Sequence, residues 1–227
     1  MKTLNVSILQ FPGTNCEYDT VYAFKRLGHH TQIIWHKADA IPENTDLVVV
    51  PGGFSYGDYL RSGSIARFAP VMKDVARFAN EGGYVLGICN GFQILTEAHL
   101  LPGALKRNNN LHFISKIQHL VTVNTDNAFL NRLKPGEVLR IPVAHADGNY
   151  YIDDEGLADL EKNGQILLRY SDAEGNPVVL NGSVEQIAGI TNKTKNVFGL
   201  MPHPERAIES ILGTEDGVRM LEGFSHA

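Results

Sequence analysis

The first hundred residues alternate short apolar runs with segments whose apolar residues recur at helical spacing. Runs rich in β-branched residues predict strands, and the segments between them predict helices. The predicted strands cover residues 4–9, 31–35, 46–50 and 84–88, and the predicted helices cover 18–27, 68–80 and 91–98. This alternation is typical of a parallel, doubly wound sheet with helices on both faces.

The second half of the chain changes to apolar runs separated by turn residues. Its predicted strands cover residues 120–125, 138–143, 166–170, 187–191 and 197–201, and a short helix is predicted at 217–224. Turn chemistry at 174–177 and 181–182 separates some of these strands. We therefore expect an α/β fold, with a mainly parallel sheet and extra strands contributed by the second half.

Composition narrows the class of protein. The chain has 227 residues, 43% hydrophobic and 20% charged, without a repeat or a long linker, so we expect one domain spanning 1–227. The formal charge is -5 and charges of both signs are interleaved, which argues against nucleic acid as a partner. The N-terminal apolar run is too short for a signal or a membrane span, which favours a cytoplasmic location without membrane attachment.

Two cysteines are present, too few for a disulfide framework, and free thiols are expected. Cys89 lies in Gly-Ile-Cys-Asn-Gly-Phe-Gln, residues 87–93, directly after a predicted strand and before a predicted helix. A nucleophile on a sharp strand-to-helix turn needs flanking glycines, and the helix N-terminus favours the thiolate. The amide of Asn90 is well placed to donate to an oxyanion. The alternative is a buried cysteine that packs as a small hydrophobe.

A thiolate that is acylated and deacylated needs a general base, usually a histidine held by a third group. His203 follows a predicted strand and lies between two prolines, and Glu205 would point the same way in an extended segment. These residues predict the base and its orienting carboxylate. The remaining histidines lack Cys, Asp or Glu at ligand-like spacing, so no metal site is expected. His145 either contacts a substrate or partner or caps its strand, and the sequence favours neither.

A second glycine-rich segment, residues 51–61, follows the strand predicted at 46–50. It lacks the Gly-Lys-Ser/Thr ending of a phosphate-binding loop. Gly53 is therefore predicted to present its amide to the cysteine pocket as a second oxyanion donor. The alternative is a plain strand-to-helix connection.

These three segments together resemble the triad class of glutamine amidotransferases. Residues 12–16, 51–61, 87–95 and 201–206 narrow the resemblance to the glutaminase subunits of phosphoribosylformylglycinamidine synthases, which belong to purine biosynthesis. The resemblance implies a flavodoxin-like fold, with Cys89 as nucleophile, His203 as base and Glu205 as the orienting carboxylate. It also implies that Gly53 and Asn90 hold the oxyanion and that Gln93 helps to bind glutamine.

The same resemblance implies hydrolysis of glutamine to glutamate and ammonia through a thioester on Cys89. Ammonia would pass to a large synthase subunit that binds ATP and Mg²⁺ and converts formylglycinamide ribonucleotide, and a small accessory subunit would join the two. No cofactor is expected in this chain.

The chain departs from the family's pattern at residues 113–116 and at residues 145–148. In the second segment Asp147 stands where the family usually has Glu. The further C-terminal helix of many relatives is also not expected here. Two other classes of function stay open. One is an amidotransferase subunit of another pathway, and the other is a flavodoxin-like thiol protein acting as a redox sensor, chaperone or peptidase. A catalytically silent partner subunit is disfavoured because all three triad positions are filled.

Overall fold

A computed structural model describes residues 2–227 of the chain. Its main sheet has nine strands in the order β2-β1-β3-β4-β11-β10-β9-β6-β7. The first five strands in this order are paired in parallel. They are β2 (His30–Trp35), β1 (Asn5–Gln10), β3 (Leu47–Val50), β4 (Tyr84–Ile88) and β11 (Val197–Leu200). This order is that of flavodoxin-like sheets, so the α/β expectation is confirmed.

The other four strands of the sheet pair antiparallel, beginning at β10. They are β10 (Ile187–Thr191), β9 (Ile166–Ser171), β6 (Ile114–Thr122) and β7 (Val138–His145). A separate small sheet joins β5 (Ala104–Lys106) to β8 (Asn149–Tyr151). The second half of the chain therefore supplies the extra strands, as the sequence predicts.

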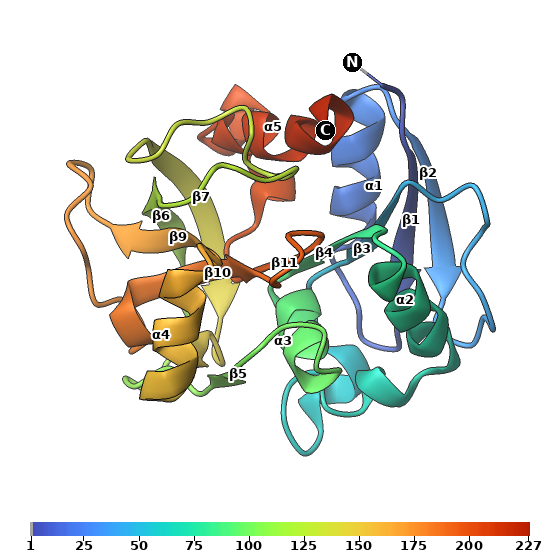
Figure 1. Cartoon of the computed structure of the whole chain (residues 1–227), viewed down its shortest axis with the longest axis horizontal. Helices are drawn as coiled ribbons and strands as arrows, with labels where there is room; N and C mark the ends of the chain where they lie inside the picture. The colour runs from blue at the N-terminus through green and yellow to red at the C-terminus, as the bar shows by residue number, and fades with distance from the viewer. Residues whose placement is uncertain (1) are drawn as a thin grey trace.

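Five α-helices accompany the sheet within residues 2–227, and helices lie on both of its faces (Figure 1). They are α1 (Glu17–Arg26), α2 (Pro70–Asn80), α3 (Asn90–Glu97), α4 (Asp154–Lys162) and α5 (Asp216–Leu221). Helices α1 and α5 both contact the short 3-10 turn Pro204–Arg206, which places them together at the base of the candidate site.

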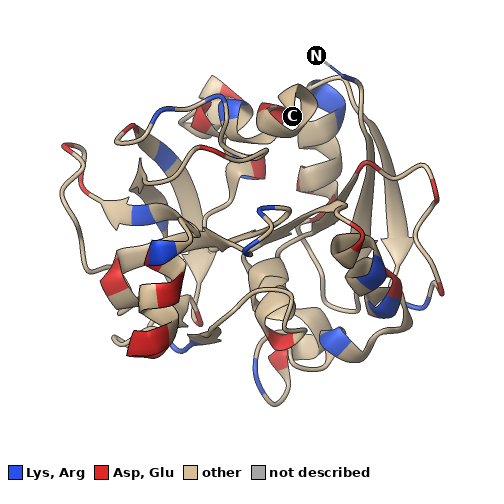
Figure 2. Ribbon diagram, viewed as in Figure 1, with Lys and Arg blue, Asp and Glu red and all other residues tan. Residues whose placement is uncertain are grey.

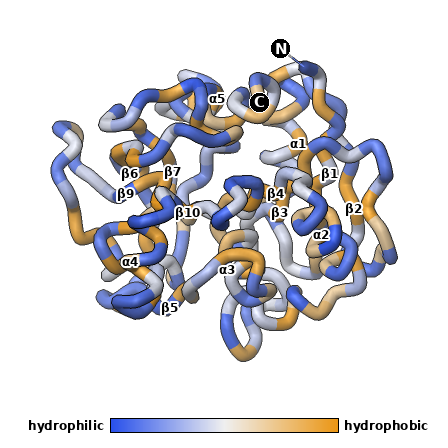
Figure 3. The backbone as a smooth tube through the Cα atoms, viewed as in Figure 1, coloured by the Kyte–Doolittle hydropathy of each residue, from blue (hydrophilic) through white to orange (hydrophobic). Residues whose placement is uncertain are grey.

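The core lies between these layers, and the hydrophobic stretches of the tube in Figure 3 follow its strands. β3 reads Leu-Val-Val-Val and is buried at every position, which is the pattern of a strand covered on both faces. Lysine, arginine, aspartate and glutamate are interspersed over the outer helices and loops (Figure 2). No helix within residues 2–227 combines the length and apolar character needed to cross a membrane.

The sequence analysis missed three elements of secondary structure and misplaced the bounds of two others. Helix α4 and the short strands β5 and β8 had not been predicted. Strand β6 begins at Ile114 and ends at Thr122 instead of covering 120–125, and α5 ends at Leu221 and continues as a 3-10 turn. In β6 the first residues are mostly exposed, so they give no alternating pattern. In α4 only Leu160 is buried, so its apolar periodicity is weak.

Candidate active site

Cys89 lies on a strained turn between β4 and α3. Its φ of 52° and ψ of −106° place a residue other than glycine in a sparsely populated region of backbone space. Two glycines make the turn possible. A Cβ on Gly91 would lie 1.8 Å from Val50 O, and one on Gly87 would lie 2.7 Å from the Gly91 carbonyl carbon. The predicted nucleophile turn is therefore present, with α3 beginning at the next residue.

His203 and Glu205 form a buried pair directly after β11. The His203 Nδ1 atom lies 2.6 Å from Glu205 Oε1, and the two side chains are 2% and 0% exposed. The backbone here is not extended as the sequence analysis assumed, because Pro204–Arg206 forms a 3-10 turn. The carboxylate still reaches the ring, since this short turn brings Glu205 back toward His203.

The electrostatics of His203 are set by its anionic neighbours. Burial alone would lower the pKa of His203, but Glu205 and then the Cys89 thiol raise it well above its usual value. The ring therefore holds a proton readily when Cys89 is a thiolate. Together these groups have the layout of a nucleophile, a base and an orienting carboxylate.

Gly53 and Asn90 both lie close to Cys89 in the fold. Gly53 lines a cavity of about 180 Å³ together with Cys89 and His203. Its φ of +137° favours glycine, and a Cβ there would lie 2.7 Å from Asn15 N. Asn90 is the first residue of α3, where backbone N–H groups lack partners within the helix. Gly53 thus lines the same cavity as Cys89 and Asn90 follows Cys89 directly, while the oxyanion role of their amides stays a prediction.

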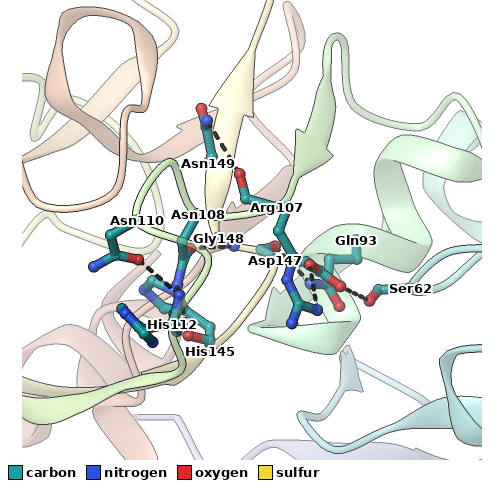
Figure 4. Close-up of polar contacts among 10 residues, drawn as sticks. All are labelled: Ser62, Gln93, Arg107, Asn108, Asn110, His112, His145, Asp147, Gly148 and Asn149. Carbon is teal, nitrogen blue, oxygen red and sulfur yellow. Dashed lines mark hydrogen bonds and ion pairs between the residues drawn. The ribbon is translucent and has the colours of Figure 1, made fainter.

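Gln93 is tied into a polar network rather than facing the cavity (Figure 4). Its Nε2 donates to Asp147 O at 2.8 Å, and its Oε1 accepts from Asn90 Nδ2 at 2.8 Å. The amide therefore holds the first turn of α3 against the segment that follows β7. The predicted contact of Gln93 with substrate stays untested.

His145 is the last residue of β7 and is buried. Its Nδ1 lies 3.1 Å from Asn108 Oδ1, an atom that also accepts from Gly148 N (Figure 4). Burial, followed by the nearby His203, lowers the pKa of His145 to about 4, so the ring is neutral at pH 7. Within residues 2–227 its Nε2 has no hydrogen-bond partner. His145 thus supports the turn at 145–148.

Three residues near the site were missed by the sequence analysis. Arg206 donates from Nη2 to the Cys16 Sγ atom at 3.0 Å, and both residues line the same cavity as Cys89. Asp58 is partly buried beside Asp147, and burial followed by the Asp147 charge raises the pKa of Asp58 to about 6. For Cys16 the only signal was its place in the glycine-containing segment 12–16. For Asp58 the only signal was that its glycine-rich loop, residues 51–61, also contains aromatic and charged residues.

A larger cavity lies elsewhere, at the N-terminal ends of β4 and β11. It measures about 500 Å³ and is lined by polar residues including Asn80, His99 and Lys193. Open α/β sheets bind ligands beyond the carboxyl ends of their strands, where Cys89 and His203 lie. The smaller cavity therefore has the better claim to the chemistry.

Comparison with known proteins agrees with this geometry. Residues 3–215 match the family model for the CobB/CobQ-like glutamine amidotransferase domain. The phosphoribosylformylglycinamidine synthase subunit PurQ of Sulfurimonas denitrificans is 63% identical over 224 residues, covering 99% of this chain and 100% of the relative. PurQ of Campylobacter jejuni is 56% identical over 221 residues, covering 97% and 96%. A chain in the structure of PurLQS from Thermotoga maritima is similar with a TM-score of 0.88 and 39% identity, covering 99% of each chain.

Proposed function

We infer that this chain, which belongs to the CobB/CobQ-like glutamine amidotransferase family, is the glutaminase subunit of a phosphoribosylformylglycinamidine synthase. The single observation that carries the activity is the buried pair of His203 and Glu205 beside a thiol on a strained turn. An amide-hydrolysing site needs this set of groups.

In the proposed reaction, the Cys89 sulfur attacks the side-chain amide carbon of glutamine. His203 takes the thiol proton and gives it to the leaving nitrogen, so ammonia departs and a γ-glutamyl thioester forms on Cys89. His203 then removes a proton from water, which attacks the thioester carbon. The carbon–sulfur bond breaks, glutamate is released, and His203 returns the proton to the Cys89 sulfur. Glu205 fixes the ring through Nδ1 and stabilises its protonated form.

The negative oxygen formed in each step needs donors fixed in advance. We assign this role to the backbone N–H groups of Gly53 and Asn90, which lie close to Cys89. We assign Gln93 a contact with substrate glutamine. In the structure its amide already bonds Asp147 and Asn90, so this contact requires an exchange of hydrogen bonds.

The proposal extends to a larger assembly. We propose that ammonia from Cys89 passes to a large synthase subunit that binds ATP and Mg²⁺ and converts formylglycinamide ribonucleotide to formylglycinamidine ribonucleotide. A small accessory subunit completes the complex. This chain contributes a single domain, residues 1–227, and the assembly works in the cytoplasm. The similarity to a chain of a structure named PurLQS supports an assembly of this kind.

The test compares two nitrogen sources in the assembled complex. Cys89→Ala is expected to abolish product formation with glutamine, by about 10⁴-fold or more, while free ammonia still supports it. The ammonia-driven rate of the same sample is the control for folding and assembly. Full glutamine-driven activity in the variant would show that Cys89 is not the nucleophile.

A further inference from the structure

We propose that Cys16, Cys89 and His203 form a binding site for a thiophilic divalent cation, for which Zn²⁺ is the probe, and that the bound cation switches the glutaminase off. The sequence analysis expected no metal site, because the histidines other than His203 lack Cys, Asp or Glu at ligand-like spacing. The fold brings Cys16, Cys89 and His203 together.

The three side chains converge on one point beside Gly52. A Cβ on Gly52 would lie 2.9 Å from His203 Cε1, 3.0 Å from Cys16 Sγ and 3.4 Å from Cys89 Cβ. The absence of a side chain at residue 52 therefore leaves a space bounded by the Cys16 thiol, the His203 ring and the Cβ atom of Cys89. Both cysteines also contribute to raising the pKa of that ring. In addition, Cys16 Sγ, a ring nitrogen of His203 and a carboxylate oxygen of Glu205 all lie within 4.8 Å of one another.

His203 is already oriented as a metal ligand. Its Nδ1 is held by Glu205 Oε1, so Nε2 is the ring atom left to bind a cation. His203 is 1% exposed, and within residues 2–227 its Nε2 has no hydrogen-bond partner. Metal-binding histidines usually carry a carboxylate on the nitrogen that does not bind the metal. Glu205 thus stays outside the ligand set and positions the ring.

The donor set selects the class of metal. Two thiolates and one imidazole match the Cys₂His ligands of zinc sites that keep a fourth position open. Soft sulfur donors favour Zn²⁺ over Mg²⁺ or Ca²⁺, which prefer oxygen. The Cys89 thiol makes only a weak contact, with Ala144 O at 3.6 Å, whereas Cys16 Sγ lies 3.1 Å from Asn15 Oδ1 and accepts from Arg206 Nη2 at 3.0 Å.

The charges around the site decide whether a cation is tolerated. Arg206 lies 3.0 Å from Cys16 Sγ and opposes a cation, but it is also paired with Asp19 at 3.0 Å. Two thiolates neutralise a divalent ion, and Glu205 adds a negative charge behind the ring. The site opens to the cavity shared by Cys16, Cys89 and His203, which provides an entry path.

Binding releases one proton from each thiol and one more from the His203 ring when that ring is protonated, and no electron is transferred. The inhibitory consequence rests on the proposed function, because the cation occupies the sulfur lone pair that would attack glutamine and the nitrogen that would accept the proton. Affinity should rise with pH, since the protons on sulfur and imidazole compete with the metal.

The experiment uses the full chain under a metal-free phosphine reductant, with Zn²⁺ titrated against glutamate release in the assembled complex. Half-inhibition of Cys16→Ala, relative to its own uninhibited rate, should require about ten-fold more Zn²⁺ or higher. Cys16→Ser, which keeps a similar volume but replaces sulfur, is expected to shift in the same direction. Chelation should restore the original rate. Equal Zn²⁺ sensitivity in wild type and Cys16→Ala, or a loss that chelation does not reverse, would overturn the proposal.

A second readout does not depend on activity. Co²⁺ in place of Zn²⁺ gives a thiolate-to-metal absorption band, which should fall to about half in Cys16→Ala and in Cys89→Ala and vanish in the double variant. An unchanged band in Cys16→Ala contradicts the site. If Cys89→Ala hydrolyses glutamine normally, the proposed function fails, while the Co²⁺ band still tests the metal site separately.

Discussion

Two polar clusters lie near the first turn of α3, one buried and the other partly exposed, and they accommodate charge in different ways. The thiol cluster, Cys89 with His203 and Glu205, joins groups that can carry opposite charges at 2.6 Å in nearly complete burial. The carboxylate cluster, Asp58 and Asp147 with Ser62, brings two like charges together, and Ser62 Oγ donates to Asp147 Oδ2 at 2.8 Å.

The first turn of α3 joins the two clusters. Asn90 Oδ1 accepts from Ser55 N at 3.1 Å, and Gln93 Nε2 donates to Asp147 O. The same turn begins directly after Cys89. The amide side chains of Asn90 and Gln93 therefore tie this turn to the backbone of the loop that carries Asp58 and of the segment that carries Asp147.

The difference in charge between the two clusters shows how the fold accommodates ionisable groups in each of them. A buried ionised pair is tolerated when its partner is opposite and hydrogen-bonded. Two neighbouring carboxylates are tolerated here because the raised pKa of Asp58 lets it keep a proton more readily, and because Asp147 is paired with Arg107 at 3.4 Å. The loop carrying Asp58 also has positive φ at Tyr56, Asp58 and Leu60, so it is held in place against local strain.

The largest expected effect comes from removing the charge of the thiol cluster. Glu205→Gln keeps the volume but cannot stabilise a protonated His203, and its amide favours the wrong tautomer. We expect the glutamine-driven rate to fall about 10³- to 10⁴-fold, with the ammonia-driven rate unchanged. Glutamate release by the complex measures this, and Glu174→Gln at an exposed turn is the matched control. A loss below ten-fold would mean that Glu205 does not orient the base.

In the carboxylate cluster, removing a charge is expected to have a smaller and favourable effect, on the free energy of unfolding. The pKa of Asp58 is raised from 3.8 to about 6 in the folded chain, so its favourable contribution is complete below pH 3.8 and is lost as the pH rises through 6. Asp58→Asn should therefore stabilise the chain at pH 8, by about 1 kcal/mol after allowance for solvent screening, and have little effect at pH 3.5. Asparagine also accepts the positive φ of this position.

Urea unfolding at both pH values measures this difference. Asp39→Asn, at an exposed position, is the control and should leave the unfolding free energy unchanged at either pH. Destabilisation by Asp58→Asn at pH 8 would show that the Asp58 carboxylate is needed in its charged form, for example as an acceptor from Ser62.

The sequence predicts the thiol cluster far better than the carboxylate cluster, and the reason is local geometry. The glycines at 87 and 91 are needed by one tight turn, and His203 and Glu205 are two residues apart, so short motifs carry both signals. The parallel strands are likewise continuous apolar runs. These features depend on neighbours in sequence.

The features that were missed depend on neighbours in space. Cys16 reaches His203 only because the segment after β1 crosses the end of β3, where Cys16 N donates to Gly52 O at 3.3 Å. Asp58 meets Asp147 across the first turn of α3, from a loop in the parallel half and a turn in the antiparallel half. No periodicity in the sequence reports such contacts.

The smallest effect tests how the two carboxylates are coupled. Asp147→Asn removes the charge that raises the pKa of Asp58 but leaves its burial, which is the larger cause, unchanged. The pKa of Asp58 should therefore fall from about 6 but stay above 3.8. Carboxyl NMR titration of the variant against wild type measures the shift, and Asp39→Asn should leave it unaltered. An unchanged pKa would mean that burial alone controls Asp58. A return of the Asp58 pKa to its ordinary value would instead show that the Asp147 charge is the main cause of the raised pKa. The two clusters would then differ only in the sign of the charge beside the titrating group.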